Sequence, residues 1–152
     1  MLRLLNEPTF VQNIGDRDVR TLEQARDYLR KGPLESYERH GFGLYLAQLR
    51  SDGAAIGLCG LVKREGLPDV DVGFALFPEY CRKGYAAEAA GEVLRHAGER
   101  LGLQRVIAIV SPGNDASIRL LHKLGFMYER HITLAADTAE VMLFGPAPRT
   151  ES

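Results

Sequence analysis

The sequence predicts a mixed α/β domain whose mostly antiparallel sheet contains a central parallel strand pair and is flanked by helices. Three β-like runs within residues 43–76, separated by short turns, indicate an antiparallel meander. After residue 76, the spacing of the hydrophobic residues changes to that of a helix. The succession of strand, helix and strand over residues 70–110 implies a right-handed crossover, which makes its two strands parallel.

The N-terminal part of the chain predicts helices. Thr21-Leu22-Glu23-Gln24 has the form of a capping box, because Gln24 stands three residues after Thr21. We expect a helix from there to about Arg30, ended by Gly32-Pro33. A short helical piece over residues 34–40, ended by Gly41, is expected next.

The meander follows these helices. Residues 43–49 and 54–62 are predicted strands, joined by the hairpin turn signal Ser51-Asp52-Gly53. A polar turn over residues 63–69 leads into a third strand over residues 70–76. Short turns of this kind connect antiparallel neighbours.

The second half of the chain alternates helices and strands. An alanine-rich apolar stripe from Ala86 to Leu101 has helical spacing and is ended by Gly102. A β-branched run over residues 105–110 is a strand. A helix capped by Asn114 or Asp115 is expected to end at Gly125. Residues 127–134 and 139–144 are predicted as final strands around a turn at residues 135–138.

The length and composition of the chain limit the classes of protein to which it can belong. The 152 residues favour one domain, placed at residues 1–145, with residues 146–152 as a flexible tail. A net charge of −1 gives no reason to expect a nucleic-acid partner. No apolar run approaches the ~20 residues of a membrane span, and a signal-peptide pattern is missing. With two cysteines, Cys59 and Cys81, and histidines that lack ligand spacing, we expect a cytoplasmic protein without a metal or membrane partner.

The most informative segment runs from Pro78 to Ala89, between a predicted strand and a predicted helix. It carries two adjacent cations, Arg82 and Lys83, followed by Gly84. Free N–H groups in the first turn of a helix bear partial positive charge, and glycine lets an anion approach the backbone. The segment therefore predicts a phosphate-binding turn at the carboxyl end of a strand.

This segment resembles the main motif of the GNAT superfamily of acyl-CoA-dependent N-acetyltransferases, Gln/Arg-x-x-Gly-x-Gly/Ala, at residues 81–86. Its continuation through Glu88-Ala89 is similar to the branch of ribosomal-protein N-terminal acetyltransferases. Residues 114–126, from Asn114 to Phe126, resemble that branch's C-terminal signature, and residues 71–74 give a softer third match. Two motifs in the expected elements are more specific than a lone glycine loop.

The resemblance implies acetyl-CoA as co-substrate. Its pyrophosphate is expected on the N–H groups of residues 83–86, with Arg82 supplying a charge. Gly73 stands where such proteins often carry a bulge that separates two strands for the pantetheine arm. A backbone N–H near Phe74 is expected to polarise the thioester carbonyl. The cofactor-binding residues implied in this way are Phe74, Ala75, Leu76, Arg82, Lys83, Gly84, Tyr85, Ala86, Asn114 and Ser117.

The resemblance also implies catalytic groups. Attack by a neutral amine requires a base, and Asp71 stands where related enzymes often place a glutamate. Asp69, Glu65 and a water chain remain alternatives for the base, and Asp71 could instead be only an exposed polar position on an alternating strand. Ser117 stands where the family protonates the departing thiolate, although a first-turn hydroxyl also bonds its own backbone. Asn114 is expected to cap its helix and to contact the pantetheine region.

Two departures from the family pattern affect the prediction. Cys81 replaces the usual Gln or Arg, and Arg82 stands where glycine is frequent, so Cys81 is a candidate reactive thiol. The first residues resemble the end of the family's first helix, so we expect the family's first strand to be absent from this sequence. An uncovered edge strand favours a homodimer.

The predicted activity is transfer of an acetyl group from acetyl-CoA to a primary amine, on a protein N-terminus or a small molecule, by direct attack. The loop Asn13–Arg17 either lines the acceptor pocket or forms a simple turn around Gly15. The alternative function is a non-catalytic module that binds acyl-CoA.

Overall fold

A six-stranded sheet forms the centre of the computed structural model, which describes residues 1–134 and 139–148. The strand order is β1-β2-β3-β4-β6-β5, and only β3 and β4 are parallel. The predicted fold class is therefore confirmed. The strands are β1 (Leu44–Gln48), β2 (Ala55–Val62), β3 (Val70–Leu76), β4 (Val106–Val110), β5 (Phe126–Ile132) and β6 (Val141–Pro146).

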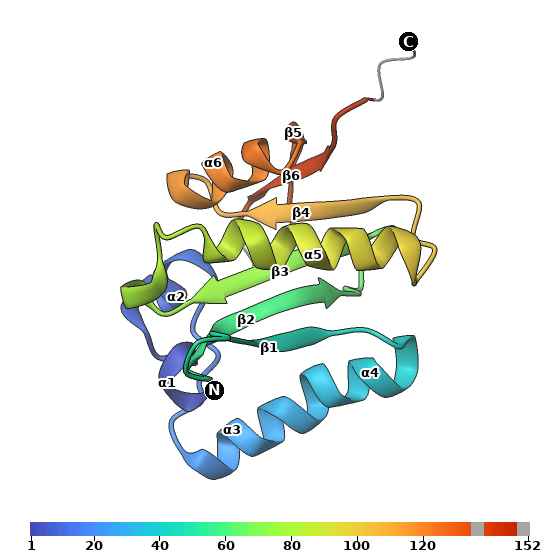
Figure 1. The fold of residues 1–152 in the computed structure, drawn as a ribbon. Coiled ribbons are helices and arrows are strands. Elements are labelled where there is room, and N and C mark those ends of the chain that lie inside the picture. Colours follow the sequence, from blue (N-terminus) through green and yellow to red (C-terminus); the bar gives the residue numbers. More distant parts are fainter. Residues whose placement is uncertain (135–138, 149–152) are drawn as a thin grey trace.

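Helices cover both faces of this sheet. Figure 1 shows α5 running along the sheet over β2 and β3, with β4 and α6 beside it, while α1 and α2 lie behind the sheet and α3 and α4 run beside β1. The α-helices are α1 (Leu2–Leu5), α2 (Pro8–Asn13), α3 (Leu22–Leu29), α4 (Glu35–His40), α5 (Tyr85–Glu99) and α6 (Asp115–Lys123).

The alternation of side chains along the strands divides the core between the two faces. On β4, Val106, Ala108 and Val110 face α5 and α6 and join the larger hydrophobic cluster. Ile107 faces the opposite side and packs with Leu143. Ala90 and Ala97 of α5 are buried in the larger cluster, because the small side chains of the predicted stripe let the helix lie close to the sheet.

The parallel pair is short. β3 and β4 pair only at Val70 with Val106 and at Asp71 with Ile107. Beyond Asp71, β3 remains paired with β2, and β4 pairs with β6. The two strands therefore separate toward their carboxyl ends, and Asp71 stands at the point where the separation begins.

The N-terminal helices differ from the prediction at Gly32-Pro33. This pair does not end the helical segment, because a π-helical turn at Arg30–Leu34 joins α3 directly to α4. Pro33 lacks an N–H donor and would clash with the carbonyl four residues back in a regular α-helix. The wider π turn accommodates the proline, as such turns do within longer helices. The end at Gly41 is confirmed, with φ of 76°.

The start of β1 is covered by α4. The hydroxyl of Tyr37 donates a hydrogen bond to the carbonyl of Leu44, and Ser36 Oγ donates to the carbonyl of Phe42 at 2.5 Å. Leu46, further along the same strand, is 59% exposed. The β1 edge predicted from the short N-terminus is thus partly covered by side chains of this chain.

The C-terminal strand extends beyond the predicted domain end. β6 continues to Pro146, which pairs with Phe126, and the N–H of Ala147 donates to the carbonyl of Gly125. The strand pairing thus reaches one residue past the predicted start of the tail. The predicted turn at residues 135–138 and the tail residues 149–152 lie outside the described residues.

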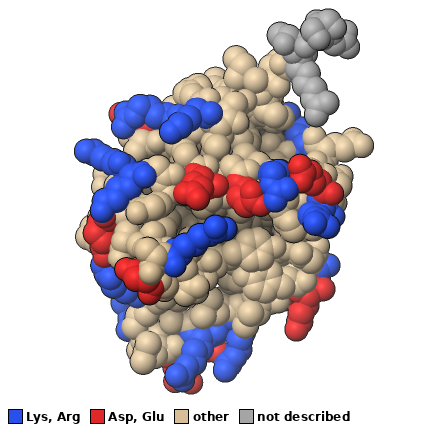
Figure 2. Space-filling model, in the orientation of Figure 1, with Lys and Arg blue, Asp and Glu red and all other residues tan. Residues whose placement is uncertain are grey.

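Basic and acidic side chains are interspersed on the face that carries α5 (Figure 2). On α5 itself, Arg95 forms ion pairs with Glu92 and Glu99. None of the helices described in the structure combines the length and apolar character needed to cross a membrane.

The capping box gives a test of the N-terminal segment. The Thr21 hydroxyl accepts from the Gln24 N–H at 3.1 Å, and the Gln24 side chain accepts from the Thr21 N–H at 3.1 Å. Thr21→Ala should lower the free energy of unfolding by about 1 kcal/mol, measured by urea denaturation. Thr9→Ala, at an exposed position of α2, should change it by less than about 0.5 kcal/mol. Equal losses would contradict a role for the cap.

Candidate active site

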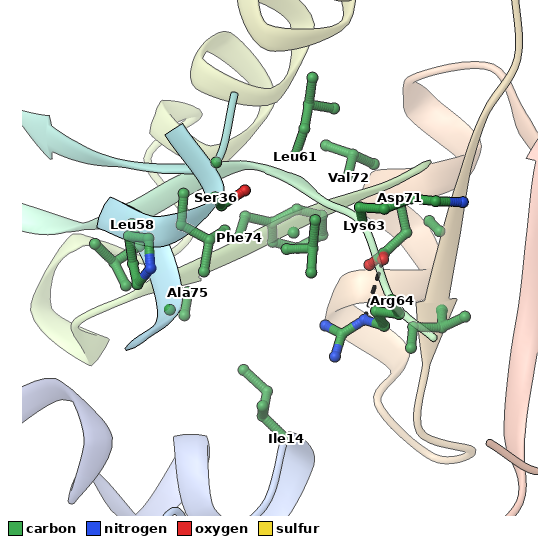
Figure 3. Close-up of a pocket in the computed structure, with 18 of the residues that line it drawn as sticks. Ile14, Ser36, Leu58, Leu61, Lys63, Arg64, Asp71, Val72, Phe74 and Ala75 are labelled. Atoms are coloured by element: carbon green, nitrogen blue, oxygen red, sulfur yellow. Dashed lines mark hydrogen bonds and ion pairs between the residues drawn. The ribbon is translucent and has the colours of Figure 1, made fainter. Parts of the chain in front are cut away.

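A cavity of about 730 Å³ is lined by residues from both faces of the sheet, among them Ala75 on one face and Phe74 and Val110 on the other. Its floor is formed by β2, β3 and β4, and its walls by α2, the π turn, α4 and the start of α6. Hydrophobic side chains such as Leu58 and Phe74 line much of it, with a few polar groups between them (Figure 3). A large, mainly apolar cavity with convergent polar groups is the usual form of a small-molecule site.

The structure brings part of the predicted site together. Asp71, Phe74 and Ala75 of β3 line the cavity, as do Asn114 and Ser117 at the start of α6. The residues of β3 and the residues of α6 stand on opposite sides of the gap between β3 and β4. Leu76 and the turn at residues 82–86 are not part of the cavity lining. That turn follows β3 and lies at the gap's outer end.

Asp71 is buried and ion-paired. Its side chain is only 2% exposed, and its Oδ1 accepts from Nε of Arg64 at 3.0 Å (Figure 3). Burial raises the pKa of the Asp71 carboxyl, while the charge and hydrogen bond of Arg64 pull the same pKa down by a smaller amount. The carboxyl is therefore more basic than an exposed aspartate.

The start of α6 has the predicted cap. Asn114 Oδ1 accepts from the backbone N–H of Ser117 at 3.4 Å. Within the described part of the chain, no hydrogen bond to the Ser117 hydroxyl is formed, so this half-buried group is available to a ligand in the cavity. Nearby, Ser111 Oγ donates to the Asn13 carbonyl at 2.7 Å, which joins the end of β4 to α2.

The turn before α5 has the geometry of an anion site. Gly84 is the N-cap of α5 with φ of 85°, and no side chain caps the helix. The first intrahelical bond runs from the Glu88 N–H to the Gly84 carbonyl, so the N–H groups of residues 85–87 precede the helical ladder. A Cβ built at Gly84 meets no atom within 4 Å, so the approach to the backbone is open. Arg82 and Lys83 are exposed beside it.

The predicted bulge at Gly73 was wrong. The register of β2 and β3 runs without a shift from Gly57 opposite Leu76 to Val62 opposite Asp71, and Gly73 pairs with Gly60. The separation of β3 from β4 has another cause, because the two strands pair with different neighbours beyond Asp71.

The thiols are not activated. Burial raises the pKa of the Cys59 thiol to about 11. Burial also raises the pKa of Cys81, whose Sγ lies 3.6 Å from the Phe77 carbonyl oxygen, and the charge of Arg82 offsets this only in part. The sequence made Cys81 only a candidate reactive thiol, and a raised pKa disfavours the thiolate that reacts.

Sequence reasoning missed Arg64. It lies in a polar turn, where a cation is usually solvated, and its partner Asp71 is seven residues away. The hairpin register, which places Val62 opposite Asp71, is the signal that brings Arg64 near this carboxylate.

The loop residues Asn13 and Arg17 do line the cavity, as one of the two interpretations of that loop predicted. The described residues contain no cluster of three or more His, Cys, Asp or Glu side chains placed to hold a metal ion.

A family model described as an acetyltransferase (GNAT) domain matches residues 1–127. This chain belongs to the GNAT acetyltransferase family. Two curated proteins of Bacillus subtilis are similar to this chain. YkkB of Bacillus subtilis is 27% identical over 134 residues, which is 85% of this chain and 74% of that protein. YnaD of the same organism, described as an uncharacterized N-acetyltransferase, is 31% identical over 111 residues, which is 73% of this chain but only 62% of that protein.

Solved structures share the GNAT fold. A putative GNAT-family acetyltransferase from Bordetella pertussis superposes with a TM-score of 0.77 at 28% identity, covering 96% of this chain and 85% of that one. A spermidine N-acetyltransferase from Vibrio cholerae in complex with CoA and spermine gives a TM-score of 0.75 at 16% identity, covering 94% of this chain and 85% of that one. The second likeness shows the fold alone.

The backbone at Arg82 gives a test of the turn. Arg82 has φ of 62°, and a left-handed conformation costs a non-glycine residue about 1–2 kcal/mol. Arg82→Gly should therefore raise the free energy of unfolding by about 0.5 kcal/mol, after the entropy cost of glycine in the unfolded chain. Lys83 has no such conformation, so Lys83→Gly should lower it by about 0.5 kcal/mol. Chemical denaturation measures both, and a loss of stability in both variants would contradict strain at Arg82.

Proposed function

We propose that this chain transfers the acetyl group of acetyl-CoA to a primary amine, on a small molecule or at a protein N-terminus. The observation that carries the proposal is the open gap between β3 and β4. Residues of the separated strands line the cavity that holds Asp71 and Ser117, and β3 continues to the anion turn before α5. GNAT acetyltransferases use acetyl-CoA as acetyl donor, and one structural neighbour is a CoA complex.

Residues of the gap would hold the co-substrate. The N–H groups at the start of α5, together with Arg82 and Lys83, suit the pyrophosphate, because the helix dipole and the cations favour negative charge there. Past Asp71, the edge of β3 that faces β4 has no strand partner among the described residues. Backbone groups near Phe74 on that edge suit hydrogen bonds to the pantetheine arm and to the thioester oxygen.

Asp71 and Ser117 divide the proton transfers between them. Asp71 accepts a proton from the acceptor ammonium through water, which leaves a neutral amine to attack the thioester carbon. The new C–N bond forms, the C–S bond breaks, and Ser117 donates its proton to the departing thiolate. The nitrogen then gives up its second proton, which restores the Ser117 hydroxyl. The products are an N-acetyl amide and CoA.

Calorimetric titration combined with an assay of thiol release tests the proposal. Acetyl-CoA should bind with micromolar affinity, and thiol should be released when an amine is added. Binding of acetyl-CoA without thiol release in the presence of any amine of a broad panel would favour the non-catalytic alternative. Absence of binding would contradict both functions.

Ser117→Ala tests the acid. Loss of the proton donor should lower kcat by about 100-fold, while the dissociation constant of acetyl-CoA changes by less than about threefold. Ser51→Ala, in the exposed turn between β1 and β2, serves as the control and should leave both values unchanged. Unchanged kcat in Ser117→Ala would remove this residue from the mechanism.

The raised pKa of Asp71 predicts the pH dependence of turnover. The base works only when deprotonated, so kcat/KM should rise with pH through the pKa of Asp71, above the ordinary aspartate value of about 3.9. A pH profile should show this limb in the wild type. Asp69→Asn should show the same limb, because the Asp69 carboxylate of the wild type pairs with Arg105 and not with Arg64. Asp71→Asn should lose the limb together with most activity. A limb that persists in Asp71→Asn would contradict its role as base.

A further inference from the structure

Arg64 is held in a fixed position at the cavity. Its side chain is 32% exposed, and its Nε donates to Asp71 Oδ1. Because Asp71 is itself almost fully buried on β3, this contact anchors the guanidinium to the sheet. An arginine fork anchored in this way is preorganised for binding, since little side-chain entropy remains to be lost.

The rest of the guanidinium is available. Figure 3 shows its two Nη nitrogens turned away from Asp71, toward the part of the cavity bounded by Ala75 and Ile14. Neither Nη donates to another group in the described part of the chain. Two parallel N–H groups of arginine match the oxygens of a carboxylate or a phosphate.

The charge of the cavity favours the same kind of ligand. The described lining residues include five cationic side chains, Arg17, Lys31, Arg39, Lys63 and Arg64. They include two carboxylates, and both are already ion-paired: Glu35 with Arg39 at 3.5 Å, and Asp71 with Arg64. A polyamine would meet an excess of positive charge here, with no unpaired carboxylate among these residues. An anion would be attracted.

The phosphates of acetyl-CoA do not account for Arg64. Arg64 binds Asp71 near the start of β3, whereas the anion turn follows Leu76 at its end. At about 3.3 Å per residue, the five residues from Asp71 to Leu76 span roughly 16 Å. Arg64 therefore lies at the reacting end of the gap, where the acceptor amine must enter.

We propose that Arg64, anchored by Asp71, binds an anionic group of the acceptor, so that the substrate is an amine bearing a carboxylate or a phosphate. The inference rests on the proposed acetyl transfer and narrows its acceptor. It separates this chain from the Vibrio cholerae neighbour described as a spermidine N-acetyltransferase in complex with spermine.

Matched pairs of amines test the inference with the wild-type protein. An α-amino acid is compared with its α-amide, and phosphoethanolamine with ethanolamine, with spermidine as a polycation. The anionic member of at least one pair should have a kcat/KM about 10- to 100-fold higher, as charge-assisted hydrogen bonds predict. The pair that shows the preference identifies carboxylate or phosphate as the recognised group. Equal values in both pairs, or a preference for spermidine, would overturn the proposal.

Arg64 variants assign the preference to this residue. Arg64→Gln should abolish the preference through a higher KM for the anionic amine, and Arg64→Lys should restore part of it. Arg50→Gln, in the exposed β1–β2 turn, should keep it. A preference that survives in a folded Arg64→Gln protein would show that Arg64 serves only as the counter-ion of Asp71, and would contradict the proposal.

The same assay separates the two proposals. Acetyl-CoA binding with thiol release from neutral amines would leave acetyl transfer standing while overturning the role of Arg64. Absence of thiol release from every amine would contradict acetyl transfer itself.

Discussion

The brevity of the parallel pairing between β3 and β4 is the constraint on which the site depends. The two strands pair at two positions only, after which each follows its antiparallel neighbour. Their separation exposes a strand edge on β3 and brings the start of α6 to the opposite side. Beyond this point β3 continues through Leu76 to the anion turn before α5. A longer parallel ladder would close this gap.

The position at which the β3–β4 pairing ends also determines which charged groups face the cavity. Asp71 occupies its last paired position and faces the side of the sheet away from α5. A carboxylate buried there requires a partner, because an unpaired buried charge is costly. Arg64 meets this requirement from the β2–β3 turn, and only one of its nitrogens is used in doing so. The same contact thus stabilises a buried acid and presents a cationic group to the cavity.

The sequence predicted those features that local chemistry determines. The Thr21 capping box, the Asn114 cap and the helix end at Gly41 depend on residues within one turn of each other. The strands of the meander follow from short-range patterns as well. The C-terminal motif located Asn114 and Ser117, and the softer match at residues 71–74 located Asp71 and Phe74; all four line one cavity in the structure.

Features that depend on tertiary contacts could not be predicted in this way. The π turn at Pro33 is compatible with a continuous segment because α4 packs on β1, which local propensity does not encode. The extension of β6 through Pro146 requires its pairing with Phe126. The pairing of Arg64 with Asp71 needs the β2–β3 register, and the bulge expected at Gly73 is replaced by divergence of whole strands.

Amide hydrogen exchange with and without acetyl-CoA tests most directly whether the β3–β4 gap receives the co-substrate. Binding in the gap should slow exchange in residues 74–76 and in residues 83–88, because ligand atoms would occupy the free strand edge and the first turn of α5. Exchange in β5, at the far edge of the sheet, should stay unchanged. Protection that is absent from both segments while acetyl-CoA is bound would contradict this account of the site.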